Sequence, residues 1–252
     1  MKLTLLEHPT PLTARDFQAR LETRLQELKG ELDADVRFVG LSPTGWAQIK
    51  ITGEDSEIMS ELIANRFALA HTELREVETN GNYEAEIIGS DGRGITFDIG
   101  TDTRASDFVI PTAHLTAQLA DGKDMPLRQV IECYCLYPGM RVGVRVDAKS
   151  GHQLEGWLSD GFADTIADWV ATGLDRIQVL ECFKREAESA VQRAHLTRDV
   201  LVVDSVTLTV QSVVCKLGTD AVGLIPKLGH ILRKQQLKPF QPKKITRHCR
   251  PW

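Results

Sequence analysis

The chain has 252 residues, of which 42% are hydrophobic and 26% charged, and this composition is typical of a folded globular protein rather than a disordered one. No apolar run approaches the roughly 18 residues that a membrane-spanning helix needs. The formal net charge is −5, and the length allows one large domain or two to three small ones.

Residues 1–80 are expected to form an N-terminal α+β module. Residues 2–8 alternate like a short strand, and Thr13 is expected to open a helix with Asp16 in a capping-box position. A hairpin of two strands follows, then a second helix, then a possible strand at 73–78. The order βαββα, with a possible last strand, is typical of the ferredoxin-like arrangement.

Residues 81–173 are expected to form a second, mainly β module. Five short strands with glycine-rich turns between them predict a small OB-type β-barrel. An insertion at 113–137, helical around Leu127–Tyr134, separates the third strand from the fourth, and an amphipathic helix at 160–173 follows the last strand. The expected strands are residues 83–88, 95–100, 107–111, 140–146 and 153–158.

Residues 174–252 are expected to form a C-terminal α+β module with a basic tail. Its predicted order is again βαββαβ, ending in an extended segment at 238–245. The two terminal modules share this element order although their residues barely match, so they are candidate structural repeats. The predicted fold class is therefore α+β, with a central five-stranded OB/S1-like barrel flanked by two ferredoxin-like modules.

Part of the chain resembles an S1-type RNA-binding domain. The matching segments are residues 94–100 (GITFDIG), 108–111 (FVIP) and 139–146 (GMRVGVRV). In the S1 family, an aromatic residue of the first segment stacks on bases, and the third strand often carries a histidine; here Thr96 and Ile110 stand at these positions. The resemblance implies the barrel, while phosphate contacts are expected elsewhere.

The chain also resembles an archaeal family of uncharacterised proteins, over most of residues 80–246. The resemblance implies an archaeal cytoplasmic protein. The N-terminus fits this location, because it reaches Glu7 and Pro9 too soon for a signal peptide. The matching segments are residues 119–123 (LADGK) with 126–128 (PLR), 173–177 (GLDRI) and 214–229 (VCKLGTDAVGLIPKLG).

Charge is unevenly distributed along the chain. Eight of the 30 cations and no acidic residue follow Asp220, so the first 220 residues carry 22 cations against 35 acidic residues, a net charge of −13. This asymmetry indicates a tail that meets phosphate or an acidic surface; alternatively, the tail packs on the acidic body of its own chain. The candidate nucleic-acid contacts are Arg141 and Arg145, which would share one face of a strand, with Lys234, Lys243, Lys244 and Arg247.

The turn at residues 216–229 is a candidate anion site. Gly218 and Thr219 precede a predicted helix and Lys216 and Lys227 flank it, so free N–H groups at the helix start could hold a phosphate. The spacing is not that of a Walker P-loop. The alternative is a capped strand-to-helix turn, in which Asp220 accepts hydrogen bonds from these N–H groups.

The sequence contains no GxSxG, HExxH or GxGxxG motif that would identify a catalytic site. The seven histidines lack metal-ligand spacing and the five cysteines contain no CxxC pair, so no metal or cofactor is expected and the cysteines are expected to be reduced. His114, with Asp121 and Asp124, could form an acid–base set, or these could be ordinary surface and capping residues.

These patterns lead us to expect a non-catalytic binding protein of archaeal translation or RNA handling, with RNA or the ribosome as partner and no membrane association. Two alternatives stay open. One is a protein-interaction scaffold in which the barrel is purely structural. The other is an enzyme with its site at the 113–137 insertion or the 216–229 turn.

Overall fold

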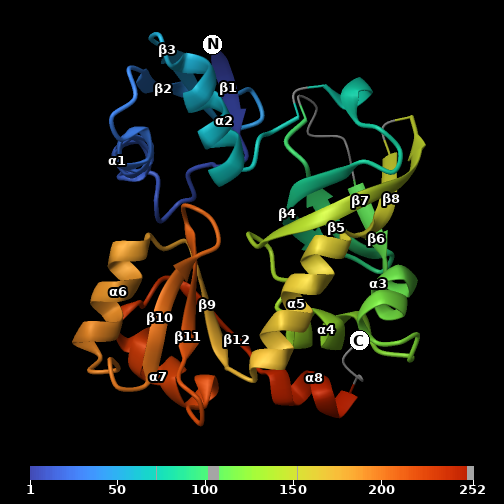
Figure 1. The fold of residues 1–252 in the computed structure, drawn as a ribbon. Helices are drawn as coiled ribbons and strands as arrows, with labels where there is room; N and C mark the ends of the chain where they lie inside the picture. Colours follow the sequence, from blue (N-terminus) through green and yellow to red (C-terminus); the bar gives the residue numbers. More distant parts are fainter. Residues whose placement is uncertain (72, 102–107, 152, 249–252) are drawn as a thin grey trace.

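The computed structural model describes residues 1–71, 73–101, 108–151 and 153–248, with the backbone alone for 247 and 248 (Figure 1). Within these residues the chain forms three β-sheets, and the central one is a closed five-stranded barrel. The predicted class, mixed α+β around a five-stranded barrel, is confirmed at this level. No helix of the described part is long and apolar enough to cross a membrane.

The N-terminal module is a three-stranded antiparallel sheet covered by two helices. The strand order is β1-β3-β2, and both pairs are antiparallel. Phe17, Leu21 and Leu25 recur at helical spacing and are buried against this sheet. The elements are β1 (Lys2–Leu5), α1 (Phe17–Lys29), β2 (Asp35–Leu41), β3 (Ala47–Thr52) and α2 (Ser56–Arg66).

Two predictions for this module were wrong. Helix α1 begins at Phe17 rather than Thr13, because the preceding residues form turns in which Thr13 Oγ1 accepts a hydrogen bond from the Thr10 N–H at 2.9 Å. The strand expected at 73–78 is a short 3-10 helix, η1 (Leu74–Glu76). At the edge of the sheet, Leu5 of β1 instead forms one isolated antiparallel bridge with Leu69.

The barrel closes in the order β4-β5-β6-β8-β7, with β6 and β8 parallel and the other pairs antiparallel. Alternation places Val142, Val144 and Val146 inside. Gly156 allows β8 to cross close to β7, because a Cβ there would lie 1.9 Å from the carbonyl oxygen of Arg145. The strands are β4 (Asn82–Ser90), β5 (Gly94–Asp98), β6 (Phe108–Pro111), β7 (Arg141–Ser150) and β8 (Gln153–Leu158).

Three helices accompany the barrel. Helix α4 (Leu127–Tyr134) has the predicted bounds, whereas α3 (Thr112–Leu119) was not predicted. Helix α5 (Asp160–Thr172) begins where Ser159 Oγ accepts the Phe162 N–H at 3.2 Å, and it ends at Gly173, which has a positive φ of 64°.

The C-terminal module is a four-stranded antiparallel sheet of order β10-β11-β9-β12, with α6 and α7 packed on one face. The extended segment predicted at 238–245 is only partly a strand. Its second half belongs to helix α8, and Ile245 is buried there. The elements are β9 (Arg176–Leu180), α6 (Lys184–Arg193), β10 (Val200–Ser205), β11 (Val210–Cys215), α7 (Ala221–Ile231), β12 (Gln236–Phe240) and α8 (Pro242–His248).

The modules share apolar cores. Phe240 and Ile245 of the C-terminal module join the barrel core, and Phe183 joins the core of the N-terminal module. The C-terminal module therefore packs against both of the others. The boundaries predicted near residues 80 and 173 stay predictions.

Candidate functional site

A cleft with a volume of about 400 Å³ opens where the three modules meet. One wall comes from α1 and the end of α2, and another comes from the start of α6 and the hairpin between β10 and β11. Figure 1 shows where these elements lie in the fold. Glu7, from the segment after β1, and Arg141, the first residue of β7, also line it. The lining therefore comes from segments far apart in the sequence.

Glu7 and Arg141 form a buried ion pair in this cleft. Arg141 Nη1 donates to Glu7 Oε1 at 2.9 Å, and the two side chains are 9% and 3% exposed respectively. Glu7 is held at its other contacts as well, because its carboxylate accepts the Leu208 N–H at 3.3 Å and its carbonyl accepts the Ala47 N–H at 2.7 Å. Arg141 Nε is buried and has no hydrogen-bond partner within the described chain. The guanidinium is therefore fixed by Glu7 at the wall of the cleft.

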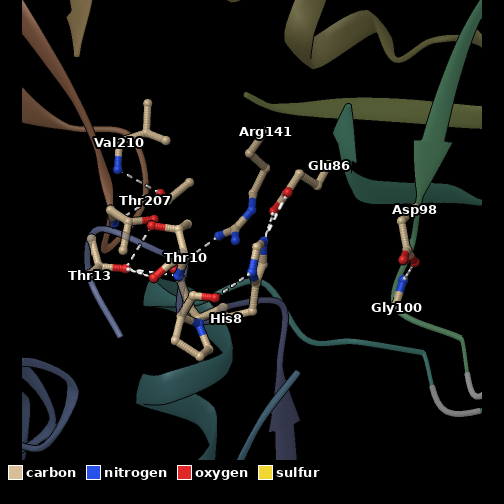
Figure 2. A network of polar contacts seen from close by, with 12 residues as sticks. His8, Thr10, Thr13, Glu86, Asp98, Gly100, Arg141, Thr207 and Val210 are labelled. Carbon is tan, nitrogen blue, oxygen red and sulfur yellow. Dashed lines mark hydrogen bonds and ion pairs between the residues drawn. The ribbon is translucent and has the colours of Figure 1, made fainter. Parts of the chain in front are cut away.

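A second polar contact lies beside this ion pair. Figure 2 shows the ring of His8 pointing at Glu86 of the barrel, with Arg141 next to them. His8 Nε2 lies 2.9 and 3.0 Å from the two carboxylate oxygens of Glu86, and the ring meets Trp46 edge-on at 5.0 Å. Burial alone would lower the pKa of His8, but the hydrogen bond and charge of Glu86 outweigh it and raise the pKa. The contact between His8 and Glu86 therefore joins the N-terminal segment to the barrel and favours the protonated form of His8.

Glu84 lies on β4, two residues before Glu86, and its pKa is raised. Burial disfavours its charged form, and this effect exceeds the opposing effect of the Arg141 charge. His8 and Glu86 also line a separate cleft of about 310 Å³, which lies between the N-terminal segment, the barrel and the C-terminal module.

The larger cleft is electropositive. Within it, Arg24 pairs with Glu27 at 3.1 Å and Arg141 pairs with Glu7, so these four charges cancel. Among the described residues, the remaining lining cations have no carboxylate at ion-pair distance, and Glu188 is the one acidic lining residue left over. The unpaired cations are Arg20, Arg66, Lys184 and Arg185.

Local structure explains how these cations reach the cleft. Arg66 ends α2, while Lys184 and Arg185 are the first two residues of α6, so all three lie at helix ends. Arg20 lies on α1, and its guanidinium is 5.8 Å from the centre of the Phe183 ring. The N-terminus of α6 is itself capped by Glu186, whose carboxylate accepts the Phe183 N–H at 3.1 Å. Arginine and lysine in this arrangement suit an anion, above all a phosphate group.

The two barrel arginines predicted as nucleic-acid contacts are held differently from each other. Both lie on the same side of β7, as the strand alternation predicted. Arg141, however, is buried with Glu7 and does not form an open contact surface. Arg145 is 38% exposed, and its guanidinium lies 4.0 Å from the Asp160 carboxylate.

The predicted C-terminal lysines lie apart from the cleft lining. Lys234, between α7 and β12, and Lys243 and Lys244, on α8, are all exposed. Pro242 and Ile245 are buried beside these lysines, so this segment packs on its own chain through apolar contacts and not through its lysines. The side chain of Arg247 lies outside the described residues.

The 216–229 turn is a capped helix start, the second of the two alternatives. Asp220 accepts the N–H groups of Val222 and Gly223 at 3.4 and 3.0 Å. Asp175 accepts the Ala221 N–H at 3.1 Å, and Gln241 donates to both carboxylates. A phosphate here would meet two carboxylates instead of free N–H groups. The N–H groups expected to hold an anion beside Lys216, Gly218, Thr219 and Lys227 are therefore already bonded to carboxylates.

His114, the histidine considered for acid–base chemistry, has structural contacts, and the buried Cys182 has a raised pKa. His114 stacks on Trp157 with ring centres 3.8 Å apart, and its Nδ1 lies 2.9 Å from the carbonyl oxygen of Gly156. Burial raises the pKa of the Cys182 thiol to about 12, so this cysteine is not a thiolate near neutral pH. Among the described residues, no three His, Cys, Asp or Glu side chains gather as a metal site.

The cleft was not predicted from the sequence. Arg20, Arg66 and Arg185 occupy exposed or half-exposed positions on three helices, where isolated cations are ordinary surface residues. No local motif links them, because only the packing of the modules brings them together. The one available signal was the acid-free C-terminal charge bias, and it pointed to other lysines.

One comparison with known proteins gives a match. Residues 174–238 match the family model described as the DUF2110 C-terminal domain. The comparison with curated proteins gives no match for this chain. The matched range includes Lys184 and Arg185 of the cleft and most of the four-stranded sheet. The C-terminal module is therefore similar to this family of uncharacterised proteins.

Proposed function

We propose that this chain is a non-catalytic RNA-binding protein of the archaeal cytoplasm, acting in translation or RNA handling, and that it holds RNA phosphate in the cleft between its modules. The observation that carries the proposal is the set of four unpaired cations, from α1, α2 and α6, around one cleft. RNA binding of this kind draws much of its affinity from phosphate neutralisation.

The sheet topologies support an OB/S1-like assignment for the barrel and a ferredoxin-like assignment for the flanking modules. In the barrel, the third and fifth strands run parallel and helices separate the third from the fourth, as expected of an OB barrel. In the C-terminal sheet, the strands lie in the spatial order 2-3-1-4 of their own sequence, as expected of a split βαβ unit. The N-terminal sheet has the same order for its first three strands.

The outer barrel surface supports placing phosphate in the cleft rather than on the barrel. Ala85 and Ile87 of β4 point into the barrel, so the alternating residues Glu84 and Glu86 point outward. Asp98 of β5 points outward as well. Carboxylates repel phosphate, and Glu86 already contacts His8 of the N-terminal segment. In this proposal the barrel is the platform on which the other two modules build the cleft.

A salt titration with paired variants tests the proposal. The probe is a fluorescent single-stranded RNA, and the variants are Lys184→Gln with Arg185→Gln at the cleft. The matched control is Arg193→Gln with Arg198→Gln, which are exposed in the same module but do not line the cleft. We expect the cleft double variant to bind more weakly and to lose about 0.7 from the slope of log K against log salt for each lost phosphate contact.

The control variant should keep the affinity and slope of the unaltered protein. The proposal fails if the unaltered protein binds no RNA at low salt, or if the cleft variant and the control bind alike. Salt-insensitive co-purification with a protein would instead favour the interaction-scaffold alternative.

A further inference from the structure

We infer that the cleft receives a terminal phosphate of the RNA together with its nucleoside, and not a running stretch of backbone. This inference rests on the proposed function and specifies the ligand of the same site. It is carried by the size of the cleft, by the convergence of its charges and by its apolar side.

The size of the cleft suits one phosphorylated nucleoside. Its volume of about 400 Å³ lies toward the lower end of the roughly 300–1,000 Å³ found for small-molecule pockets. Surfaces that track a single strand are longer, since they accommodate roughly 4–16 nucleotides per OB fold. The end of an RNA chain can fill a cleft of this size, whereas an internal nucleotide would also need a path for the chain on its other side.

The charges converge on one volume instead of following a line. Arg20 and Arg66 belong to the N-terminal module, and Lys184 and Arg185 belong to the C-terminal module on the other side of the cleft. With Glu188 included, the unpaired lining charge is +3. A phosphate monoester carries about −1.5 to −2 at neutral pH, whereas each backbone phosphodiester carries one negative charge. The surplus positive charge therefore favours the monoester.

Arg141 supplies the preformed element of the site. Its side chain is 9% exposed and lines the cleft, and its Nε has no hydrogen-bond partner within the described chain. Glu7 holds the other end of the guanidinium, so the group loses little conformational freedom when an anion arrives. The Nε itself is closed off from solvent, so Arg141 contributes a fixed guanidinium beside the cleft rather than an open donor.

The cleft also has an apolar side that a nucleoside could contact. Leu28, Phe67 and Leu208 line it together with the cations. Inorganic phosphate would leave these side chains uncovered, whereas a phosphate with an attached nucleoside can contact both the charged and the apolar lining.

The test compares oligonucleotides that differ only at their ends. One single-stranded RNA is prepared with a 5′-phosphate, with a 3′-phosphate, with hydroxyl groups at both ends, and as a closed circle. We expect one of the two phosphorylated forms to bind about tenfold or more tightly than the hydroxyl and circular forms, as loss of charge-assisted hydrogen bonds implies. A nucleoside monophosphate competitor distinguishes free nucleotide from RNA end as the source of the phosphate.

The variants Arg66→Gln and Arg185→Gln should remove this preference, while Arg193→Gln should keep it, because Arg193 is exposed at the far end of α6. Circular dichroism checks that each variant is folded. Equal affinity for all four RNA forms would overturn the inference and leave the proposed function intact. Absence of binding to every form at low salt would instead overturn the proposed function.

Discussion

At the residue scale, Glu7 joins the three modules. Its carbonyl binds the N-terminal sheet, and its carboxylate binds Arg141 of the barrel and the Leu208 N–H of the C-terminal module. A buried ion pair adds little stability relative to a well-packed apolar pair, but loss of one partner leaves a buried charge uncompensated. The stability of the molecule should therefore respond strongly to this position.

We predict that Glu7→Ala lowers the free energy of unfolding by about 3–5 kcal/mol, because Arg141 would remain buried without its carboxylate. Urea denaturation measures the change. Glu61→Ala, at an exposed position of α2, is the control and should stay within about 0.5 kcal/mol of the unaltered protein. Equal unfolding midpoints for the two variants would show that the ion pair does not hold the modules.

His8 should make the stability of the protein depend on pH. Its pKa is raised above the ordinary 6.5 by the hydrogen bond and charge of Glu86, which outweigh the opposing effect of burial, and Glu7 acts in the same direction as Glu86. The folded state therefore holds this proton more tightly than the unfolded state. The resulting stabilisation is fully present below pH 6.5 and is lost as pH rises through the raised pKa of the folded state.

We therefore expect the difference in unfolding free energy between the unaltered protein and His8→Gln to shrink as pH rises from below 6.5. Urea unfolding at a series of pH values measures this difference. The unfolding free energy of Glu86→Gln should depend on pH less than that of the unaltered protein, as should that of His8→Gln. A difference that stays constant with pH would contradict a raised pKa of His8 in the folded state.

At the element scale, alternation and turn residues predict the barrel, while element ends depend on contacts that the sequence does not display. The five strands and α4 follow directly from their hydrophobic patterns. Helix α1 begins late because Thr10 and Thr13 bond with each other across a turn. Helix α8 was missed because a short helix with one buried isoleucine has too little periodicity to distinguish it from a strand.

Gly156 tests the closure of the barrel. We predict that Gly156→Ala destabilises the protein by about 1–3 kcal/mol or more, because the new Cβ would overlap the carbonyl oxygen of Arg145 and approach the Phe108 ring. Gly161→Ala is the matched control, since a Cβ in the first turn of α5 meets open space and alanine favours a helix. Thermal unfolding compares them, and a stable Gly156→Ala protein would mean that β7 and β8 approach less closely.

At the scale of the whole molecule, the function proposed here belongs to no single module. Residue types and spacing led us to expect a binding protein and reveal a basic C-terminal segment, but they do not reveal that Arg20, Arg66 and Arg185 surround one cleft. That information resides in the packing of modules through Phe183 and through the Glu7 contacts. It could be recovered from the sequence only by knowing which surfaces of the modules face each other.

The most direct measurement of the central claim is an amide hydrogen-exchange footprint with and without 5′- or 3′-phosphorylated single-stranded RNA. We predict slower exchange on RNA binding in residues 184–188 at the start of α6, in the 205–208 hairpin and around Arg66, which all line the cleft. The amide exchange of helix α8 and of strand β4 should be the same with and without RNA. Protection confined to α8 or to the barrel, with none at the cleft, would contradict the account.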